Sequence, residues 1–240
     1  MPPRPRSDPS AQTRKRILDT AERLFGERGV AAVSLRDINR TAGISQGVLH
    51  YHFGGRDALI EAILQRWLPG VNAERRQMYD AILAAGRTPS ERDVVEILCL
   101  PLARLATARQ PAGRRFLRCL ARLGQEENPV WARTTRTQMS GVELHEALQA
   151  CAPGASPALI EWYFSMMLNV IHGTLSEAGR AARSWQRALA AEPMSPEDQA
   201  EALVEFICEG VGGLVRRNQP AAGTPRAQES RPRGRGAARA

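Results

Sequence analysis

The sequence lacks the patterns that mark several large classes of protein. Its four cysteines are far apart and include no Cys-x-x-Cys pair, which argues against a zinc site or a disulfide framework and fits a reducing compartment. No apolar run reaches the roughly 18–20 residues that a membrane-spanning helix needs. Residues 1–12 contain no apolar segment of the kind found in a secretory signal. The chain is therefore expected to work in the cytoplasm, with no contact with a membrane.

Motifs that carry catalysis are also missing. The sequence has no Gly-x-Ser-x-Gly, no phosphate-binding loop and no paired carboxylates at a spacing that suits acid–base chemistry. His50 and His52 have no cysteine or acid at metal-ligand spacing, and His145 and His172 are isolated. The acidic pair Glu126-Glu127 is interpreted as solvated surface. No enzymatic activity, cofactor or metal site is expected.

Positive charge is present in excess, and its distribution is uneven. The formal net charge is +8, of which residues 1–67 carry +4, residues 218–240 carry +4 and residues 68–217 carry none. A basic N-terminal segment suits binding to the phosphates of nucleic acid. An excess of this size over 67 residues is modest, so charge alone does not establish nucleic-acid binding.

The stretch from Ser34 to Arg56 predicts two short helices around a tight turn. Ser34 suits an N-cap, and Asp37 follows three residues later as the acidic half of a capping box. Gly43 can adopt the left-handed backbone that a sharp turn between helices requires. Ser45 is then a second N-cap, which starts the second helix.

The second of these helices is expected to present polar side chains to solvent. Val48 and Leu49 point inward, as Leu35 and Ile38 do from the first helix. A helix of about seven residues is marginal in water by itself, so its neighbours must hold it. A short polar helix presented by a tight turn is what a reader of the DNA major groove needs. The residues left at its surface are Gln46, Gly47, His50 and Tyr51.

Helical periodicity continues through the rest of the chain, and no alternating strand pattern competes with it. An all-α fold is therefore predicted. A helix over 13–28 has one apolar stripe, and a fourth helix begins near Arg56 and ends at Pro69-Gly70. Further helices are expected near 72–85, 90–108, 112–126, 129–151, 157–182 and 196–216.

Two of the expected helices suggest a homodimer. In helix 157–182 the polar residues form only a thin stripe, which implies burial on more than one side. Helix 196–216 has one broad apolar face with Phe206 outside it, and its glycines permit close helix approach. We infer that these helices from two subunits form a four-helix interface. A monomer with a deep core remains the alternative.

Residues Thr13–Trp67 resemble the DNA-binding helix-turn-helix of the TetR (AcrR-like) bacterial transcriptional regulators. Three positions depart from the family pattern: Asn39 replaces a small alanine, His50 replaces tyrosine and Arg56 replaces lysine. Arg56 keeps a phosphate contact possible, His50 suggests an unusual specificity, and Asn39 could be a surface or DNA contact. The matching residues are Ser34-Leu35-Arg36-Asp37-Ile38, Ala42-Gly43-Ile44-Ser45, Gly47-Val48-Leu49, Tyr51-His52-Phe53 and Asp57-Ala58-Leu59.

The resemblance implies a set of residues that contact DNA. Gln46 is suited to pair with an adenine edge in the major groove, and the resemblance gives Tyr51 a backbone contact. His52 is expected to support packing against Phe53 rather than to touch DNA. Phosphate contacts are expected from Ser34, Arg36 and Arg56, and the residues expected to face the DNA are Ser45, Gln46, Gly47, His50 and Tyr51.

The resemblance also implies a ligand pocket in the C-terminal region, which no sequence motif marks. The absence of a charged cluster favours an apolar or amphipathic small molecule, with Arg118 or His172 available to orient a polar end. Each candidate lining residue could equally be ordinary core. The candidates are Met78, Leu98, Leu102, Phe116, Cys119, Trp131, Trp162, Met166 and Met167.

Together these features predict a homodimeric repressor that a small molecule releases from a palindromic operator. An activator, or a regulator without a ligand, remains an alternative. A structural protein that binds nucleic acid without specificity through its basic tails is another. The expected organisation is a disordered arm (1–12), a helix-turn-helix DNA-binding domain (13–68), a helical ligand-binding and dimerisation domain (69–217) and a disordered basic tail (218–240).

Overall fold

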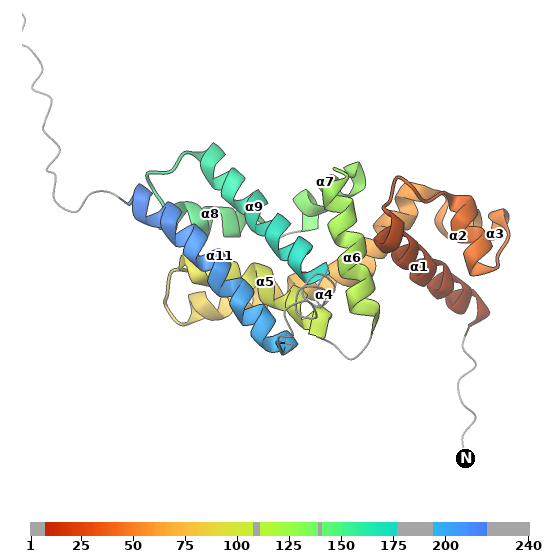
Figure 1. Cartoon of the computed structure of the whole chain (residues 1–240), viewed down its shortest axis with the longest axis horizontal. Helices are drawn as coiled ribbons and strands as arrows, with labels where there is room; N and C mark the ends of the chain where they lie inside the picture. Colours follow the sequence, from red (N-terminus) through yellow and green to blue (C-terminus); the bar gives the residue numbers. More distant parts are fainter. Residues whose placement is uncertain (1–7, 108–110, 139–140, 177–193, 220–240) are drawn as a thin grey trace, which may run out of the picture.

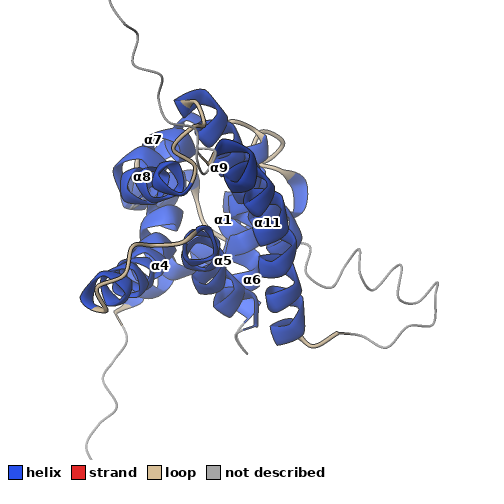
Figure 2. Cartoon of the chain, turned by 90° about the vertical axis from the view of Figure 1, so that its left-hand side faces the viewer, coloured by secondary structure: helices blue, strands red, loops and turns tan. Residues whose placement is uncertain are grey.

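The computed structural model describes residues 8–107, 111–138, 141–176 and 194–219, and these contain helices and no strands (Figure 2). The predicted all-α fold is confirmed. Most of the predicted arm and tail, and the end of the helix predicted over 157–182, lie outside the described residues. The helices are α1 (Pro9–Arg28), α2 (Leu35–Ala42), α3 (Gln46–Phe53), α4 (Arg56–Ala84), α5 (Glu91–Thr107), α6 (Pro111–Gln125), α7 (Pro129–Gln138), α8 (Gly141–Cys151), α9 (Pro157–Ser176) and α11 (Pro196–Asn218).

Helix α1 begins earlier than its hydrophobic periodicity predicts, within the stretch expected to be disordered. The side chain of Asp8 caps it by accepting a hydrogen bond from the Ser10 backbone N–H at 2.9 Å, and Pro9 occupies the first helical turn. Proline is favoured there because the missing N–H would have no partner in any case. The predicted apolar stripe is buried, and it consists of Ile17, Leu18, Ala21, Leu24 and Phe25.

Helix α4 runs without a break through Pro69 and Gly70, where the sequence predicted an end. Proline removes a helical hydrogen bond and crowds the preceding turn. Both residues lie on the exposed side of α4, whereas Leu68 before them and Val71 after them are buried. Packing on both sides of Pro69 therefore outweighs its local cost, and the expected domain boundary at residue 68 falls inside one continuous helix.

The remaining helices form the larger part of the molecule. Helix α11 packs mainly against α5, and α6 packs against both α9 and α1. The single helix predicted over 129–151 is two helices, α7 and α8, and Gly141 begins the second. Pro101 is buried inside α5, which continues through it. Among the helices of the described ranges, none combines the length and apolarity that a membrane span requires.

Helices α1, α2 and α3 lie at one end of the molecule, and α8, α9 and α11 lie toward the other (Figure 1). Helices α4 and α6 lie between these two groups (Figure 1). Helices α4 and α6 therefore connect the C-terminal helices with the N-terminal end, and both of them contact α1.

Candidate nucleic-acid interface

The start of α2 is fixed by the predicted capping box. The hydroxyl of Ser34 accepts a hydrogen bond from the Asp37 N–H at 3.2 Å, and the Asp37 carboxylate accepts one from the Ser34 N–H at 3.1 Å. The Asp37 carboxylate also accepts a hydrogen bond from the Ser34 hydroxyl at 2.5 Å, and this bond, followed by the one from the Ser34 N–H, holds the pKa of Asp37 below its ordinary value. The box orients α2, and Arg36 lies exposed in its first turn.

The turn after α2 has the predicted geometry. Gly43 has φ 61° and ψ 44°, which is the left-handed region that side chains other than glycine rarely adopt. The backbone N–H of Ile44 donates to the carbonyl of Asn39 at 3.0 Å, which closes the turn. Helix α3 therefore leaves α2 in a direction set by local backbone chemistry.

Helix α3 divides into a buried and an exposed face as the sequence predicted. Leu49 and Phe53 are buried in the core and Val48 packs partly against it. Tyr51 is 84% exposed, although aromatic side chains are usually buried when a core is available. Gln46, Gly47 and His50 are also exposed. These four residues form the outward face of α3, and α3 lies at one end of the molecule (Figure 1).

Ser45 occupies the N-cap position of α3 with an extended backbone, but its side chain makes no capping hydrogen bond. Its exposed hydroxyl remains available to a ligand such as DNA. His52 is half-buried, and its ring lies 5.3 Å from the ring of Tyr51 and 6.2 Å from that of Phe53. The packing interpretation of His52 agrees with these contacts.

Asn39 is buried, so the expectation that it could be a surface or DNA contact is wrong. Only 6% of the residue is exposed, and its side-chain carbonyl oxygen has no hydrogen-bond partner among the described residues. The side chain fills the position that a small alanine occupies in the family pattern. A residue in the core between short helices cannot reach a DNA groove.

Arg56 has an intramolecular role that the sequence did not reveal. Its guanidinium donates hydrogen bonds to the carbonyls of Val33, at 2.6 Å, and of Val30, and it lies 5.6 Å from the centre of the Phe25 ring. These contacts fasten the α1–α2 loop to the start of α4. A contact between Arg56 and a DNA phosphate stays a prediction, and it would compete with these hydrogen bonds.

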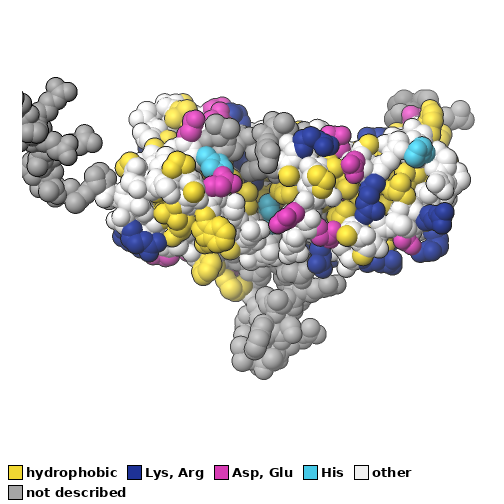
Figure 3. Space-filling view, turned by 90° about the horizontal axis from the view of Figure 1, so that it is seen from above, with side chains coloured by type: hydrophobic (Ala, Val, Ile, Leu, Met, Phe, Trp, Pro, Cys, Tyr) yellow, Lys and Arg dark blue, Asp and Glu magenta, His cyan; other side chains and the backbone are white. Residues whose placement is uncertain are grey.

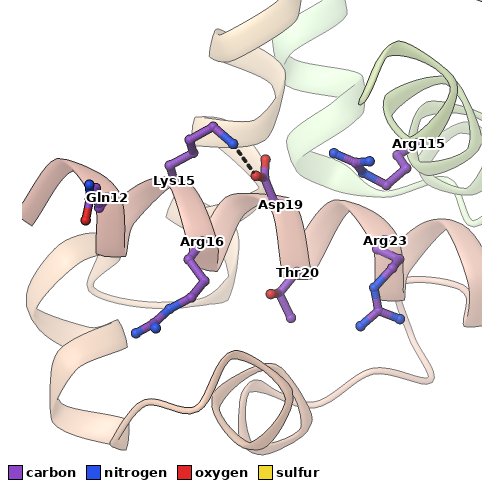
Figure 4. A pocket seen from close by; sticks show the side chains of 7 residues that line it. All are labelled: Gln12, Lys15, Arg16, Asp19, Thr20, Arg23 and Arg115. Atoms are coloured by element: carbon purple, nitrogen blue, oxygen red, sulfur yellow. Dashed lines mark hydrogen bonds and ion pairs between the residues drawn. The ribbon is translucent and has the colours of Figure 1, made fainter. Parts of the chain in front are cut away.

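A basic groove of about 430 Å³ lies along α1, where Arg115 of the neighbouring helix α6 approaches it (Figure 4). It is lined by Lys15, Arg16 and Arg23 of α1 and by Arg115, which comes from α6. Lys15 is paired with Asp19 at 2.6 Å, whereas Arg16 points away from that pair (Figure 4). Basic side chains gather over the end of the molecule that contains α1, α2 and α3 (Figure 3). The sequence could not associate Arg115 with α1, because the two are far apart in the chain.

Glu126, just after α6, binds the loop that precedes α2. Its carboxylate accepts hydrogen bonds from the backbone N–H groups of Val30, at 2.8 Å, and of Ala31, at 2.7 Å. Glu126 is exposed, as the sequence predicted, but its carboxylate also holds this loop, which the sequence did not reveal. Helix α6 also crosses α1 closely, because a Cβ placed on Gly26 would lie 2.9 Å from the Cβ of Arg118. Helix α6 and Glu126 after it thus hold the end of the molecule formed by α1, α2 and α3 directly.

Replacing Glu126 with glutamine is expected to lower the free energy of unfolding by about 1–2 kcal/mol, because an uncharged amide supplies one acceptor for two backbone donors. Chemical denaturation followed by circular dichroism measures the change. The same substitution at Glu127 is the matched control, because Glu127 is exposed and makes no side-chain hydrogen bond within the described residues. Equal stability of the two variants would contradict a structural role for Glu126.

The residues expected to line a ligand pocket are divided between the core and the surface. Leu98, Leu102, Phe116, Cys119 and Met167 are buried, and Met78 and Trp131 are partly buried against the same core. Trp162 and Met166 are instead 63% and 41% exposed. They lie on the outer face of α9, where they cannot line an interior pocket of a single subunit.

Comparisons with known protein families match two regions of the chain. Residues 17–63 match the model described as "Bacterial regulatory proteins, tetR family", and residues 96–210 match "Tetracyclin repressor-like, C-terminal domain". The chain is 36% identical over 80 residues to the HTH-type transcriptional repressor KstR2 of Rhodococcus jostii, a match of 32% of this chain and 39% of that relative. The chain thus spans about two-fifths of the length of that curated relative.

Two longer matches cover most of the chain. The HTH-type transcriptional regulator BetI of Brucella anthropi is 27% identical over 185 residues, which are 65% of this chain and 93% of that protein. The solved structure of the ketosteroid transcriptional regulator KstR2 of Mycobacterium tuberculosis aligns with a TM-score of 0.52 and 19% identity. It covers 82% of this chain and 93% of that chain. At this identity the structural likeness concerns the fold.

Proposed function

Because the chain belongs to the TetR family of bacterial regulatory proteins, we propose that it is a homodimeric transcriptional repressor that a small molecule releases from operator DNA. The observation that carries this proposal is the exposed face of α3. The capped helix α2 and the left-handed turn at Gly43 present that face at one end of the molecule. The family consists of transcription regulators, which agrees with the absence of catalytic motifs from the sequence.

In this proposal α3 enters the major groove of the DNA. Gln46, at the start of α3, pairs with a base, while Ser45, Gly47, His50 and Tyr51 complete the contact surface. The phosphates on either side are bound by Ser34, Arg36 and Arg56 and by the basic groove along α1. Phosphate contacts position the helix, whereas the contacts of Gln46 and His50 with base edges supply the sequence preference.

Replacing Gln46 with alanine is expected to weaken binding to the specific operator by about 1–3 kcal/mol and to leave binding to random DNA nearly unchanged. The reason is that a side chain that reads a base edge contributes only where the correct base is present. Fluorescence anisotropy with operator and scrambled duplexes measures both affinities. An equal loss on both duplexes would mean that Gln46 contacts the backbone rather than a base.

Dimerisation is proposed to use the outer faces of α9 and α11. Trp162 and Met166 of α9 and Phe206 of α11 are large apolar side chains left exposed, and Phe206 is 69% exposed. Apolar side chains gather on the side of the molecule that α9 and α11 occupy (Figure 3). The broad apolar stripe of α11, from Leu203 to Val215, is already buried within the subunit. The residues outside that stripe are therefore the ones left for a partner.

A two-fold dimer presents two copies of α3 to the DNA, which requires a palindromic operator with half-sites about one helical turn apart or somewhat more. A ligand within the C-terminal helices would change the separation of the two reading helices through α4 and α6. Release from DNA follows only if the ligand binds the non-binding arrangement more tightly. In this proposal the ligand is apolar or amphipathic.

The test is selection of bound sequences from a random duplex DNA library at physiological salt, with the full chain and with a chain that lacks residues 218–240. A palindromic consensus recovered by both proteins supports a specific dimeric regulator. Recovery of no consensus, with binding that collapses as salt rises and disappears with the tail, would leave only phosphate attraction and would refute the proposal.

A further inference from the structure

A charged residue occupies a core position on α4. The buried stripe of α4 contains Leu68, Val71, Arg75 and Ile82, which follow one another at helical spacing. Arg75 is only 3% exposed although three of these four positions are apolar. Arginine is rarely buried to this extent unless an acidic partner neutralises it.

Arg75 has no such partner in the described part of the chain. Its guanidinium donates one hydrogen bond, from Nη2 to the carbonyl of Leu98 at 3.0 Å. The Nε atom is buried without a partner, and the described residues provide no carboxylate within ion-pair distance. A guanidinium carries five N–H donors, so most of its binding capacity is unused.

The charge on Arg75 nevertheless persists. Burial lowers its pKa to about 10, which still leaves the group protonated at neutral pH. An apolar side chain of similar size at a buried position is often as stable as, or more stable than, a charged one. An unpaired cation in the core therefore lowers the stability of the fold, so the stability of the fold does not explain why an arginine stands at position 75.

His172 of α9 is close enough to Arg75 for the positive charge to act on its imidazole. It is 7% exposed, its ring packs edge-on against Trp131 at 5.7 Å, and none of the described residues forms a hydrogen bond with its ring nitrogens. Burial, and then the positive charge of Arg75, lower the pKa of His172 to about 3, so its imidazole is neutral. A neutral imidazole keeps one N–H donor. The core therefore contains a cation with unused donors and, within the range of its charge, a neutral imidazole.

We propose that Arg75, together with His172, binds the carboxylate of an amphipathic small-molecule effector within the C-terminal helices. This inference rests on the proposed function and specifies the chemistry of its effector. The planar guanidinium matches a carboxylate through two parallel hydrogen bonds. Leu98, whose carbonyl accepts the Arg75 hydrogen bond, and Trp131, which packs against His172, provide apolar surface for the rest of the molecule. The effector thus has one anionic end and an apolar body.

The test compares two carboxylates with their uncharged counterparts, octanoate with 1-octanol and benzoate with benzyl alcohol. Binding to the full-length protein is followed by tryptophan fluorescence, to which Trp131 contributes, and by the shift in melting temperature. We expect the protein to prefer at least one carboxylate over its alcohol by roughly tenfold to a hundredfold, as a charge-assisted hydrogen bond provides.

Replacing Arg75 with methionine is expected to reduce that preference to about onefold, while the unliganded protein melts at the same or a higher temperature. Replacing Arg75 with lysine keeps the charge without the planar fork and is expected to retain part of the preference. Replacing Arg76 with methionine is the matched control, because Arg76 is the neighbouring arginine and pairs with Glu143 on the surface. That variant should keep the full preference.

The proposal is overturned if neither carboxylate is preferred to its alcohol, or if the preference survives in the methionine variant at position 75. The outcome is separable from that of the proposed function. A carboxylate that binds through Arg75 without changing operator affinity would leave the anion site intact and refute ligand-controlled repression. A protein that selects no operator would refute the repressor, and the carboxylate preference would still decide the role of Arg75.

Discussion

Replacing both Trp162 and Phe206 with glutamate is expected to produce a monomer and to lower operator affinity by on the order of a thousandfold or more. The two side chains are among the most exposed large apolar groups of the described residues, at 63% and 69%. Charges placed at these positions would be desolvated in a dimer interface without a partner, which is strongly unfavourable. A monomer contacts one half-site only, so its affinity falls toward the non-specific range.

Analytical ultracentrifugation measures the oligomeric state, and titration of a labelled operator measures the affinity. The matched control is glutamate at Leu83, which is 49% exposed on α4 and belongs to neither α9 nor α11. That variant should remain dimeric and should bind the operator as the parent protein does. A double variant that stays dimeric would place the interface elsewhere and refute the proposed use of α9 and α11.

Replacing Gly113 with alanine is expected to destabilise the protein by about 3 kcal/mol, which corresponds to a fall in melting temperature of roughly 6–12 °C. A Cβ at Gly113 would lie 2.4 Å from the backbone carbonyl oxygen of Leu105. Because that oxygen belongs to the backbone of α5, it cannot move aside as a flexible side chain would. Helices α5 and α6 would have to separate.

The same substitution at Gly124, near the other end of α6, is the matched control with the opposite sign. Its nearest neighbour would be the indole nitrogen of Trp131 at 3.6 Å, which is an ordinary contact. Alanine should therefore stabilise α6 there by about 0.5–1 kcal/mol through helix propensity. Differential scanning calorimetry distinguishes the two results, and equal melting temperatures would contradict the role of close packing at Gly113.

Helices α4 and α6 provide the physical connection between the proposed effector site and the DNA-reading end. Arg75 lies on α4, the same helix that begins with Arg56, whose guanidinium holds the α1–α2 loop. The Glu126 carboxylate, at the end of α6, holds the same loop from the other side. A shift of either helix would therefore change the position of α2 and α3. In the proposed regulation, a ligand that displaces α4 or α6 would thereby move α3.

The sequence by itself determined the helix-turn-helix formed by α2 and α3. The capping box of Ser34 and Asp37, the left-handed turn at Gly43 and the inward side chains of α3 all depend on residues a few positions apart. Interactions at such short range can be deduced from the spacing of residue types, because local geometry is nearly the same in every helix and turn. The all-α class follows from the same periodicity, which also located most of the later helices.

Only the tertiary structure decided what happens where distant segments meet. Local rules predicted that Pro69 ends a helix, and packing on both sides of it overrides them. Glu126 and Val30 are 96 residues apart in the chain, and no sequence pattern pairs them. The exposure of Trp162 and the burial of Arg75 could not be predicted either, because periodicity shows which residues share a face of a helix but not which neighbour covers that face. Burial depends on the whole packed chain, and it placed an aromatic residue outside and a cation inside.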